Sequence, residues 1–270
     1  MQDFFYHKPT SLETAVSIFE SIEDGVFLAG GQTILPVMKL GLAQPSDVID
    51  LKAIGELTKI NVTNNLVSIG AMNTHSSVSA SKEIRKKIPG LAQLASLIGD
   101  VQVRNRGTIG GSLANNDPSA DYPAALLALK GRVITNKRCI SAEDFFVDMF
   151  ETALEQGEII IRIDFPITDF SAYAKFPNPI SRYAIVGVFV SKTSDEVQLA
   201  VTGGGHMVFR ALDFEKALRK DFSSNAIKNI AISADDLNTD IHASNEYRAH
   251  LVNVMAKRAV EDAVNNGTTG

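Results

Sequence analysis

Two stretches of the chain, residues 29–36 and 108–121, are rich in glycine and small polar residues. A loop that binds phosphate closely needs backbone N–H groups that point inward and a backbone with few Cβ atoms. Gly30 and Gly31 meet that need, and a helix expected to begin near Thr33 directs further N–H groups and a partial positive charge to the same place. The first stretch is therefore a candidate phosphate-binding loop, with a plain strand–turn–helix connection as the alternative.

The second stretch keeps to small residues for longer than a surface turn requires. Gly107, Gly110 and Gly111 fall within five positions, and small polar residues follow as far as Asp121. Such a track is typical of backbone that wraps closely around a cofactor, and Asp117 and Asp121 could accept hydrogen bonds from ribityl or ribose hydroxyl groups. An Asx-rich turn without a ligand is the alternative.

Two common nucleotide-binding signatures are absent from the sequence. Neither stretch contains a lysine, so neither is a Walker-type loop. The spacing G-x-G-x-x-G occurs nowhere in the 270 residues, which argues against a Rossmann domain for hydride transfer.

The composition argues against several kinds of partner and cofactor for this chain. With 26 Lys and Arg against 31 Asp and Glu, the net charge is −5, which argues against nucleic acid. Cys139 is the single cysteine, so the chain cannot hold an iron–sulfur cluster alone. The N-terminus lacks the pattern of a signal peptide, and no apolar run approaches the roughly 20 residues that span a bilayer. We therefore expect no membrane span, and a cytoplasmic location.

Helical and strand periodicity predicts three units of mixed structure that position the two stretches: residues 1–55, 56–170 and 171–270. The expected helices are 11–23, 33–40, 91–98, 122–129, 214–219 and 245–264. The expected strands are 26–29, 47–51, 57–62, 66–70, 158–165, 183–191 and 196–202. Residues 265–270 are expected to form a frayed tail.

The motifs, taken together and in order, resemble the FAD-binding medium subunit of the molybdenum hydroxylases, the carbon monoxide dehydrogenase and xanthine dehydrogenase family. The segment AGGQTILP at 29–36, with MKL at 38–40, is similar to that family's first pyrophosphate motif. The segment RGTIGGSLA at 106–114, with DP at 117–118 and DYP at 121–123, is similar to its second. GAMNTH at 70–75 matches a further short signature, and the resemblance covers essentially the whole chain.

The resemblance implies an α+β fold: a two-subdomain FAD-binding domain of the vanillyl-alcohol-oxidase and p-cresol methylhydroxylase type, followed by a small C-terminal α+β domain that covers the isoalloxazine. It places the pyrophosphate between residues 30–35 and the second motif, the adenine near Ile160, and a lysine, Lys175, near the flavin. The residues expected to bind the cofactor are Ala29, Gly30, Gly31, Gln32, Thr33, Ile34, Leu35, Thr108, Gly111, Ser112, Ala114, Asp117, Asp121, Ile160 and Lys175.

The function implied by the resemblance is electron transfer through non-covalent FAD. A large partner subunit would carry the molybdenum cofactor and a small one two 2Fe–2S clusters, in a dimer of heterotrimers. No catalytic side chain and no metal ligand is expected on this chain. Two alternatives stay open: a stand-alone FAD-dependent reductase on the same fold, or a non-catalytic nucleotide-binding or assembly module.

Four further residues have a plain interpretation beside a functional one. We expect His75 to have a structural or cofactor-proximal role rather than a covalent bond to flavin. Arg104 could neutralise phosphate or cap the preceding helix. Cys139 is expected to be a buried small hydrophobe, and His206, after three glycines, part of a structural turn.

Overall fold

The first unit is a small parallel sheet flanked by short helices. We describe residues 2–194 and 196–266 from a computed structural model. Three strands pair in the order β1-β3-β2, with all neighbours parallel, because the connecting segments α1 and α2 return the chain to the same edge. The elements are β1 (Phe5–His7), α1 (Leu12–Glu20), β2 (Gly25–Leu28), α2 (Ile34–Lys39) and β3 (Asp47–Asp50).

The second unit is built on a five-stranded antiparallel sheet in the order β4-β5-β10-β6-β7. Its strands are β4 (Ile60–Val62), β5 (Leu66–Gly70), β6 (Arg132–Thr135), β7 (Cys139–Ser141) and β10 (Ile160–Pro166), with a separate hairpin of β8 (Phe146–Asp148) and β9 (Glu151–Thr152). Its helices are α3 (His75–Ala80), α4 (Lys82–Lys87), α5 (Pro89–Ser96), α6 (Val101–Arg104), α7 (Ile109–Asn115), α8 (Tyr122–Ala128) and α9 (Ala142–Phe145).

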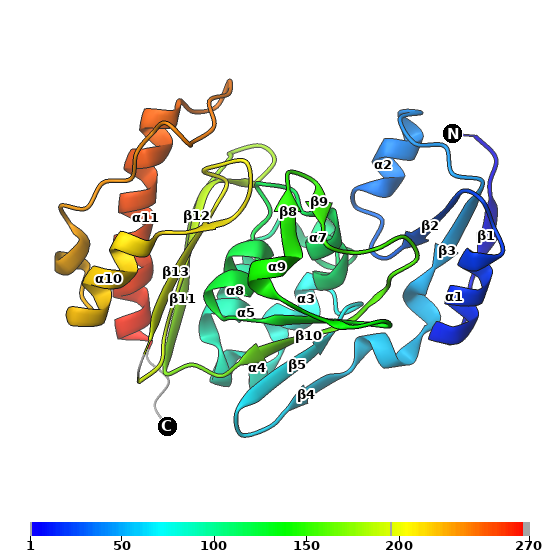
Figure 1. The fold of residues 1–270 in the computed structure, drawn as a ribbon, viewed down its shortest axis with the longest axis horizontal. Helices are drawn as coiled ribbons and strands as arrows, with labels where there is room; N and C mark the ends of the chain where they lie inside the picture. Colours follow the sequence, from blue (N-terminus) through cyan, green and yellow to red (C-terminus); the bar gives the residue numbers. More distant parts are fainter. Residues whose placement is uncertain (1, 195, 267–270) are drawn as a thin grey trace.

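The third unit is a four-stranded antiparallel sheet with helices on one face. Its elements are β11 (Phe170–Pro177), β12 (Ala184–Lys192), β13 (Val197–Thr202), β14 (Phe209–Arg210), α10 (Leu212–Lys220) and α11 (Asn245–Asn265). One face packs on α10 and α11, and the other packs on α5 and α8 of the second unit (Figure 1). Because both faces are covered, β12 is buried along nearly its whole length rather than at alternate residues.

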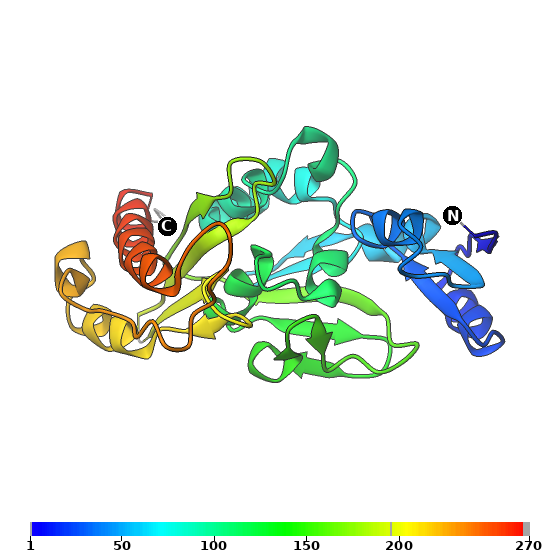
Figure 2. The ribbon, with the colours of Figure 1, turned by 90° about the horizontal axis from the view of Figure 1, so that it is seen from above.

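The three units lie in a row, with the second in the middle (Figure 2). No helix of the described residues is both long and apolar enough to cross a membrane. Part of the tail expected at 265–270 belongs to α11, which ends at Asn265, and residues 267–270 lie outside the described part of the chain.

The structure corrects three local predictions. Residues 109–115, expected as irregular backbone, form helix α7. The strand expected over 57–62 covers only Ile60–Val62, because Gly55–Thr58 forms a 3₁₀ turn. Cys139 was expected to be buried and is exposed, because it lies on β7, an edge strand, on the side away from the core residue Ile140.

Candidate functional site

A cavity of about 690 Å³ lies between the first unit and the second, and both glycine-rich stretches line it. Its size is within the range typical of small-molecule and cofactor sites. Thirteen of the fifteen residues expected to bind a cofactor contribute to its wall: Ala29, Gly30, Gly31, Gln32, Thr33, Ile34, Thr108, Gly111, Ser112, Ala114, Asp117, Asp121 and Ile160. The fold therefore brings together residues that are up to about 130 positions apart in the chain.

The first stretch supplies free backbone donors. It turns sharply after β2 at Gly31, whose φ of 74° is in the left-handed region that favours glycine. Within the described residues, the backbone N–H groups of Gln32, Thr33 and Ile34 donate no hydrogen bond, as expected for the first turn of a helix. Thr33 is the N-cap of α2 but its hydroxyl caps nothing, so it too is free to meet a ligand.

The two stretches touch through their backbones. A Cβ atom added at Gly30 would lie 2.2 Å from the carbonyl oxygen of Arg106 and 2.7 Å from Cα of Gly107. No side chain fits in that space, so the approach of the two loops requires glycine at position 30. The double glycine thus has a second task that the phosphate-loop interpretation did not include.

The second stretch presents side chains rather than free N–H groups. Thr108 caps α7 by accepting a hydrogen bond from Gly111 N at 3.1 Å. The N–H groups of Ile109 and Gly110 donate to the carbonyls of Asn73 and Ala71 at 3.0 and 2.9 Å. The signature at 70–75 therefore lies directly behind the second motif.

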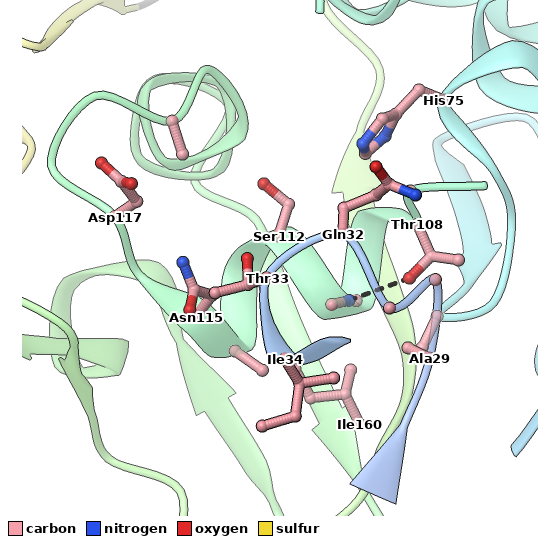
Figure 3. Close-up of a pocket in the computed structure, with 18 of the residues that line it drawn as sticks. Ala29, Gln32, Thr33, Ile34, His75, Thr108, Ser112, Asn115, Asp117 and Ile160 are labelled. Atoms are coloured by element: carbon pink, nitrogen blue, oxygen red, sulfur yellow. Dashed lines mark hydrogen bonds between the residues drawn. The ribbon is translucent and has the colours of Figure 1, made fainter. Parts of the chain in front are cut away.

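Polar side chains of both stretches gather on one part of the cavity. Figure 3 shows Gln32 and Thr33 of the first loop close to Ser112 and Asn115 of α7. None of these four side chains forms a hydrogen bond within the described residues, so all remain available to a ligand.

Asp121 lines the cavity and takes part in a buried network. Its Oδ1 accepts a 2.5 Å hydrogen bond from the Tyr173 hydroxyl, and Lys175 Nζ lies 2.9 Å from Oδ1 and 3.0 Å from Oδ2. Burial raises the pKa of Asp121, and the charge of Lys175 and the Tyr173 hydrogen bond partly oppose that effect. The side chains of Asp121 and Lys175 are 3% and 2% exposed, so the ion pair is almost fully desolvated.

Two expected residues do not reach the cavity wall. Leu35 packs beneath the loop, where its Cδ1 lies 2.7 Å from the position of a Cβ on Gly31. Lys175, on β11, is bound to Asp121 and to the carbonyl of Leu97 at 3.2 Å. Any effect of Lys175 on a ligand in the cavity acts through Asp121.

His75 is a buried imidazole at the edge of the cavity (Figure 3). Burial, with a contribution from the charge of Arg104, lowers its pKa to about 4, so the ring is neutral at pH 7. Its Nδ1 has no hydrogen-bond partner among the described residues. Arg104 donates to the carbonyls of Ile98 and Gly99 at 3.0 and 2.9 Å, which favours capping over phosphate binding.

Several residues of the cavity were missed from the sequence. Nothing in the sequence marked Asn115 as a binding residue within the second stretch. Tyr183, which is 46% exposed, stood at the start of an expected strand and had no motif around it. The apolar part of the wall includes Val26, Phe27, Ile98, Val103 and Leu154, which are spread over all of the first two units. Such side chains are indistinguishable in sequence from ordinary core residues.

The arrangement fits a dinucleotide cofactor. Free N–H groups and hydroxyls in its wall suit a pyrophosphate, and the apolar side chains in its wall suit planar ring systems. Among the described residues, no group of three or more His, Cys, Asp or Glu side chains is placed to hold a metal ion.

Comparison with family models assigns both parts of the chain. Residues 2–168 match the model described as the FAD binding domain in molybdopterin dehydrogenase. Residues 171–263 match the model of the CO dehydrogenase flavoprotein C-terminal domain.

Individual relatives agree with the family models over nearly their full length. The chain is 36% identical to the nicotine 6-hydroxylase medium subunit of Paenarthrobacter nicotinovorans and 32% identical to the carbon monoxide dehydrogenase medium chain of Hydrogenophaga pseudoflava, each with 96% of both chains covered. The solved carbon monoxide dehydrogenase of Hydrogenophaga pseudoflava matches with a TM-score of 0.89 over 98% of this chain and 99% of that one, at 32% identity. Quinoline 2-oxidoreductase from Pseudomonas putida 86 matches with a TM-score of 0.89 at 26% identity, with 99% of both chains covered.

These findings confirm the predicted fold class and the resemblance of the chain to this family. Both glycine-rich stretches lie within the part of the chain matched as an FAD-binding domain, and residues 181–183 of the part matched as the C-terminal domain also line the cavity. The chain belongs to the family of FAD-binding medium subunits of the molybdenum hydroxylases, and it is an oxidoreductase subunit of the carbon monoxide dehydrogenase and xanthine dehydrogenase type.

Proposed function

We propose that FAD occupies the cavity with its pyrophosphate between the two glycine-rich stretches. The observation that carries this proposal is that the unused N–H groups of Gln32, Thr33 and Ile34 and the free hydroxyl of Ser112 belong to residues that line one cavity, together with apolar side chains. An anion is favoured there by hydrogen bonds and by the dipole of α2 rather than by a lysine.

Individual roles follow from position. Residues 29–34 surround the pyrophosphate from one side, with Leu35 supporting the turn from below. Thr108, Gly111, Ser112 and Ala114 close the other side, and Ile160 meets the adenine. Asp117 and Asp121 accept hydrogen bonds from cofactor hydroxyl or ring N–H groups, and Lys175 orients Asp121.

The proposed activity is electron transfer within a larger complex. When bound, FAD would supply the redox chemistry that links 2Fe–2S clusters on a small partner subunit to a terminal acceptor. A large partner subunit carries the molybdenum cofactor and oxidises the substrate, in a dimer of heterotrimers. Medium chains of multi-subunit dehydrogenases among the relatives support this division, as does the single exposed cysteine of this chain.

The chain itself binds, orients and shields the cofactor. The free N–H groups of α2 hold the pyrophosphate, and the apolar walls exclude water from the ring systems. The buried Asp121–Lys175 pair fixes a polar group in the cavity wall. We propose residues 1–55 and 56–170 as the two FAD-binding subdomains and 171–270 as the domain that covers the flavin.

The experiment is purification of the chain from its native source, followed by absorption spectroscopy and identification of the co-purifying chains. We expect flavin absorption bands, together with one chain that contains 2Fe–2S clusters and one that contains molybdenum. A chain that purifies alone, binds no added FAD and shows no thermal shift with it would refute the proposal. If the isolated chain binds FAD and turns over an organic substrate by itself, a stand-alone reductase replaces the electron-transfer role.

A further inference from the structure

Arg248, in the first turn of α11, makes three short hydrogen bonds. It lies 65 positions along the chain from Tyr183, the cavity-lining residue nearest to it in sequence. The Arg248 side chain is 4% exposed. Nη1 donates to the carbonyl oxygens of Ile185 and Gly203, both at 2.6 Å, and Nη2 donates to Oδ2 of Asp240 at 2.6 Å. One guanidinium therefore joins the ends of β12 and β13 to the loop before α11.

β12 and β13 separate at this end, and their free backbone groups turn to another segment. Their pairing ends at Gly187 and Thr202. Beyond that point, the N–H of Ala184 donates to the carbonyl of Ser119 at 3.3 Å, and the N–H of Gly203 donates to the carbonyl of Pro118 at 2.8 Å. Residues 118–120 thus bind the opened ends of the two strands, while Arg248 satisfies the carbonyls on the other side.

Gly203 is the bridge between Arg248 and Pro118. It has a φ of 76°, and a Cβ at this position would lie 2.4 Å from the carbonyl oxygen of Ala184. Its carbonyl accepts from Arg248 and its N–H donates to the carbonyl of Pro118, so the backbone of one residue connects the guanidinium to the loop. This is the structural reason for the first glycine of the run at 203–205.

A second contact fixes the same loop. The hydroxyl of Thr202, which is 0% exposed, lies 2.6 Å from the carbonyl oxygen of Ala120 and 3.0 Å from that of Pro118. The segment 118–120 is therefore held in the interior by groups from the third unit. A displacement of the end of β13 must displace this segment as well.

Segment 118–120 is flanked by the two aspartates of the cavity wall, Asp117 and Asp121. Asp117 Oδ1 accepts from the N–H of Ser119 at 2.8 Å, so its carboxylate also depends on the segment. We propose that Arg248 is a positioning residue for the cofactor site: by fixing the carbonyls of Ile185 and Gly203, it sets the position of residues 118–120 and of both carboxylates. This inference rests on the proposed FAD site and adds to it a control element in the third unit.

The physical reason is the cost of leaving buried carbonyls without a donor. Removal of the guanidinium leaves the carbonyl groups of Ile185 and Gly203 without their donor in a buried place, where unsatisfied polar groups are unfavourable. Both peptide units would rotate or shift to find another donor. Gly203 itself contacts residues 118–120, and Ile185 follows Ala184, which also contacts them. The loss therefore reaches the cavity through the backbone rather than through a side chain in the cavity.

The test compares Arg248→Met and Arg248→Lys with Arg210→Met in the full chain. Arg210 is a matched control, because it forms an ion pair with the buried Glu215 in the same unit but does not line the cavity. We expect Arg248→Met to raise the dissociation constant of FAD about tenfold and to change the absorption spectrum of the bound flavin, and Arg248→Lys to restore part of both. Arg210→Met should lower the melting temperature and leave FAD binding and the spectrum unchanged.

A second pair keeps the inference testable if Arg248→Met does not fold. Thr202→Val removes the hydroxyl at nearly constant volume, and Thr202→Ser retains it. We expect weaker FAD binding and an altered flavin spectrum in Thr202→Val and near-normal values in Thr202→Ser. The inference is overturned if Arg248→Met and Thr202→Val both leave FAD binding and the flavin spectrum unchanged. If Arg248→Met is unfolded, unchanged binding and spectrum in Thr202→Val alone overturn it. Failure of the unmodified chain to bind FAD would instead refute the proposed function.

Discussion

Gly30 and Arg106 are in direct backbone contact, so close that a Cβ at position 30 would lie 2.2 Å from the Arg106 carbonyl oxygen. The contact joins the loop after β2 to the first residue of the second motif, 106–114. It brings the free N–H groups of α2 to one side of the cavity and the hydroxyl of Ser112 to the other. The site is therefore a product of two units, and Gly30 is the residue that allows their two loops to approach this closely.

Gly30→Ala tests that contact. The added methyl group overlaps backbone atoms that cannot move aside as a flexible side chain would, so we expect a loss of about 1–3 kcal/mol in the free energy of unfolding and weaker FAD binding. Gly55→Ala is the matched control, because a Cβ at Gly55 meets no atom within 4 Å. Denaturant unfolding and FAD titration measure both effects. Equal behaviour of the two variants would show that the close contact has no energetic consequence.

Lys175→Met should strongly destabilise the fold, because it leaves the buried carboxylate of Asp121 without its cation. Breaking one partner of a buried ion pair costs about 3–5 kcal/mol. We expect the double variant Lys175→Met/Asp121→Asn to regain part of that loss, since it removes the unpaired charge as well. Urea unfolding of Lys175→Met, Asp121→Asn and the double variant gives the coupling free energy between the two side chains. If the double variant loses as much unfolding free energy as the two single variants together, the ion pair does not stabilise the fold.

His75 should make stability depend on pH between about 6.5 and 4. Its pKa falls from 6.5 in the unfolded chain to about 4 in the fold, so the unfolded chain binds more protons in this range. The contribution of the neutral His75 ring to the free energy of unfolding is complete above pH 6.5. It is lost as the pH falls toward 4, by up to about 3 kcal/mol. Unfolding free energies of the unmodified chain and of His75→Gln at pH 7, 5.5 and 4 measure it. Parallel pH profiles would contradict the assignment.

Glu158 should contribute in a lower pH range. Burial opposes its ionisation, but hydrogen bonds from Arg138, the Glu155 N–H and Thr135 outweigh that effect and lower its pKa to about 2. The stabilisation is therefore present above the unfolded pKa of 4.5 and is lost as the pH falls toward 2. Glu158→Gln should cost about 1–3 kcal/mol at pH 7 and have little effect near pH 2. A cost that is the same at both pH values would exclude the ionised hydrogen-bond network.

Elements with local signals could be predicted from the sequence. Helix α11 was expected over 245–264 and spans Asn245–Asn265, because its apolar residues recur at helical spacing behind the capping residue Ser244. The strands β12 and β13 were likewise found within two residues of their bounds. Their patterns depend on neighbours in the chain and need no knowledge of the fold.

Elements that depend on distant contacts could not be predicted in this way. Helix α7 is made of small residues with weak helix preference, and it is fixed by carbonyls of Ala71 and Asn73 that accept from its first turn. The two motifs located the site, but the role of Lys175 behind Asp121 and the presence of Tyr183 depend on how β11 and β12 pack beside the cavity. The exposure of Cys139 depends on the place of β7 at the edge of its sheet.

The most direct test of the account is a titration of FAD into the flavin-free chain, followed by fluorescence, for the unmodified protein and for Gly31→Val and Gly111→Val. Gly31 has a φ of 74°, and a Cβ at Gly111 would lie 2.9 Å from Oγ1 of Thr108, so each substitution disturbs one side of the proposed pyrophosphate site. We expect saturable binding of one FAD by the unmodified chain and an affinity at least about tenfold lower in each variant. Full FAD affinity in both variants would contradict the proposed site.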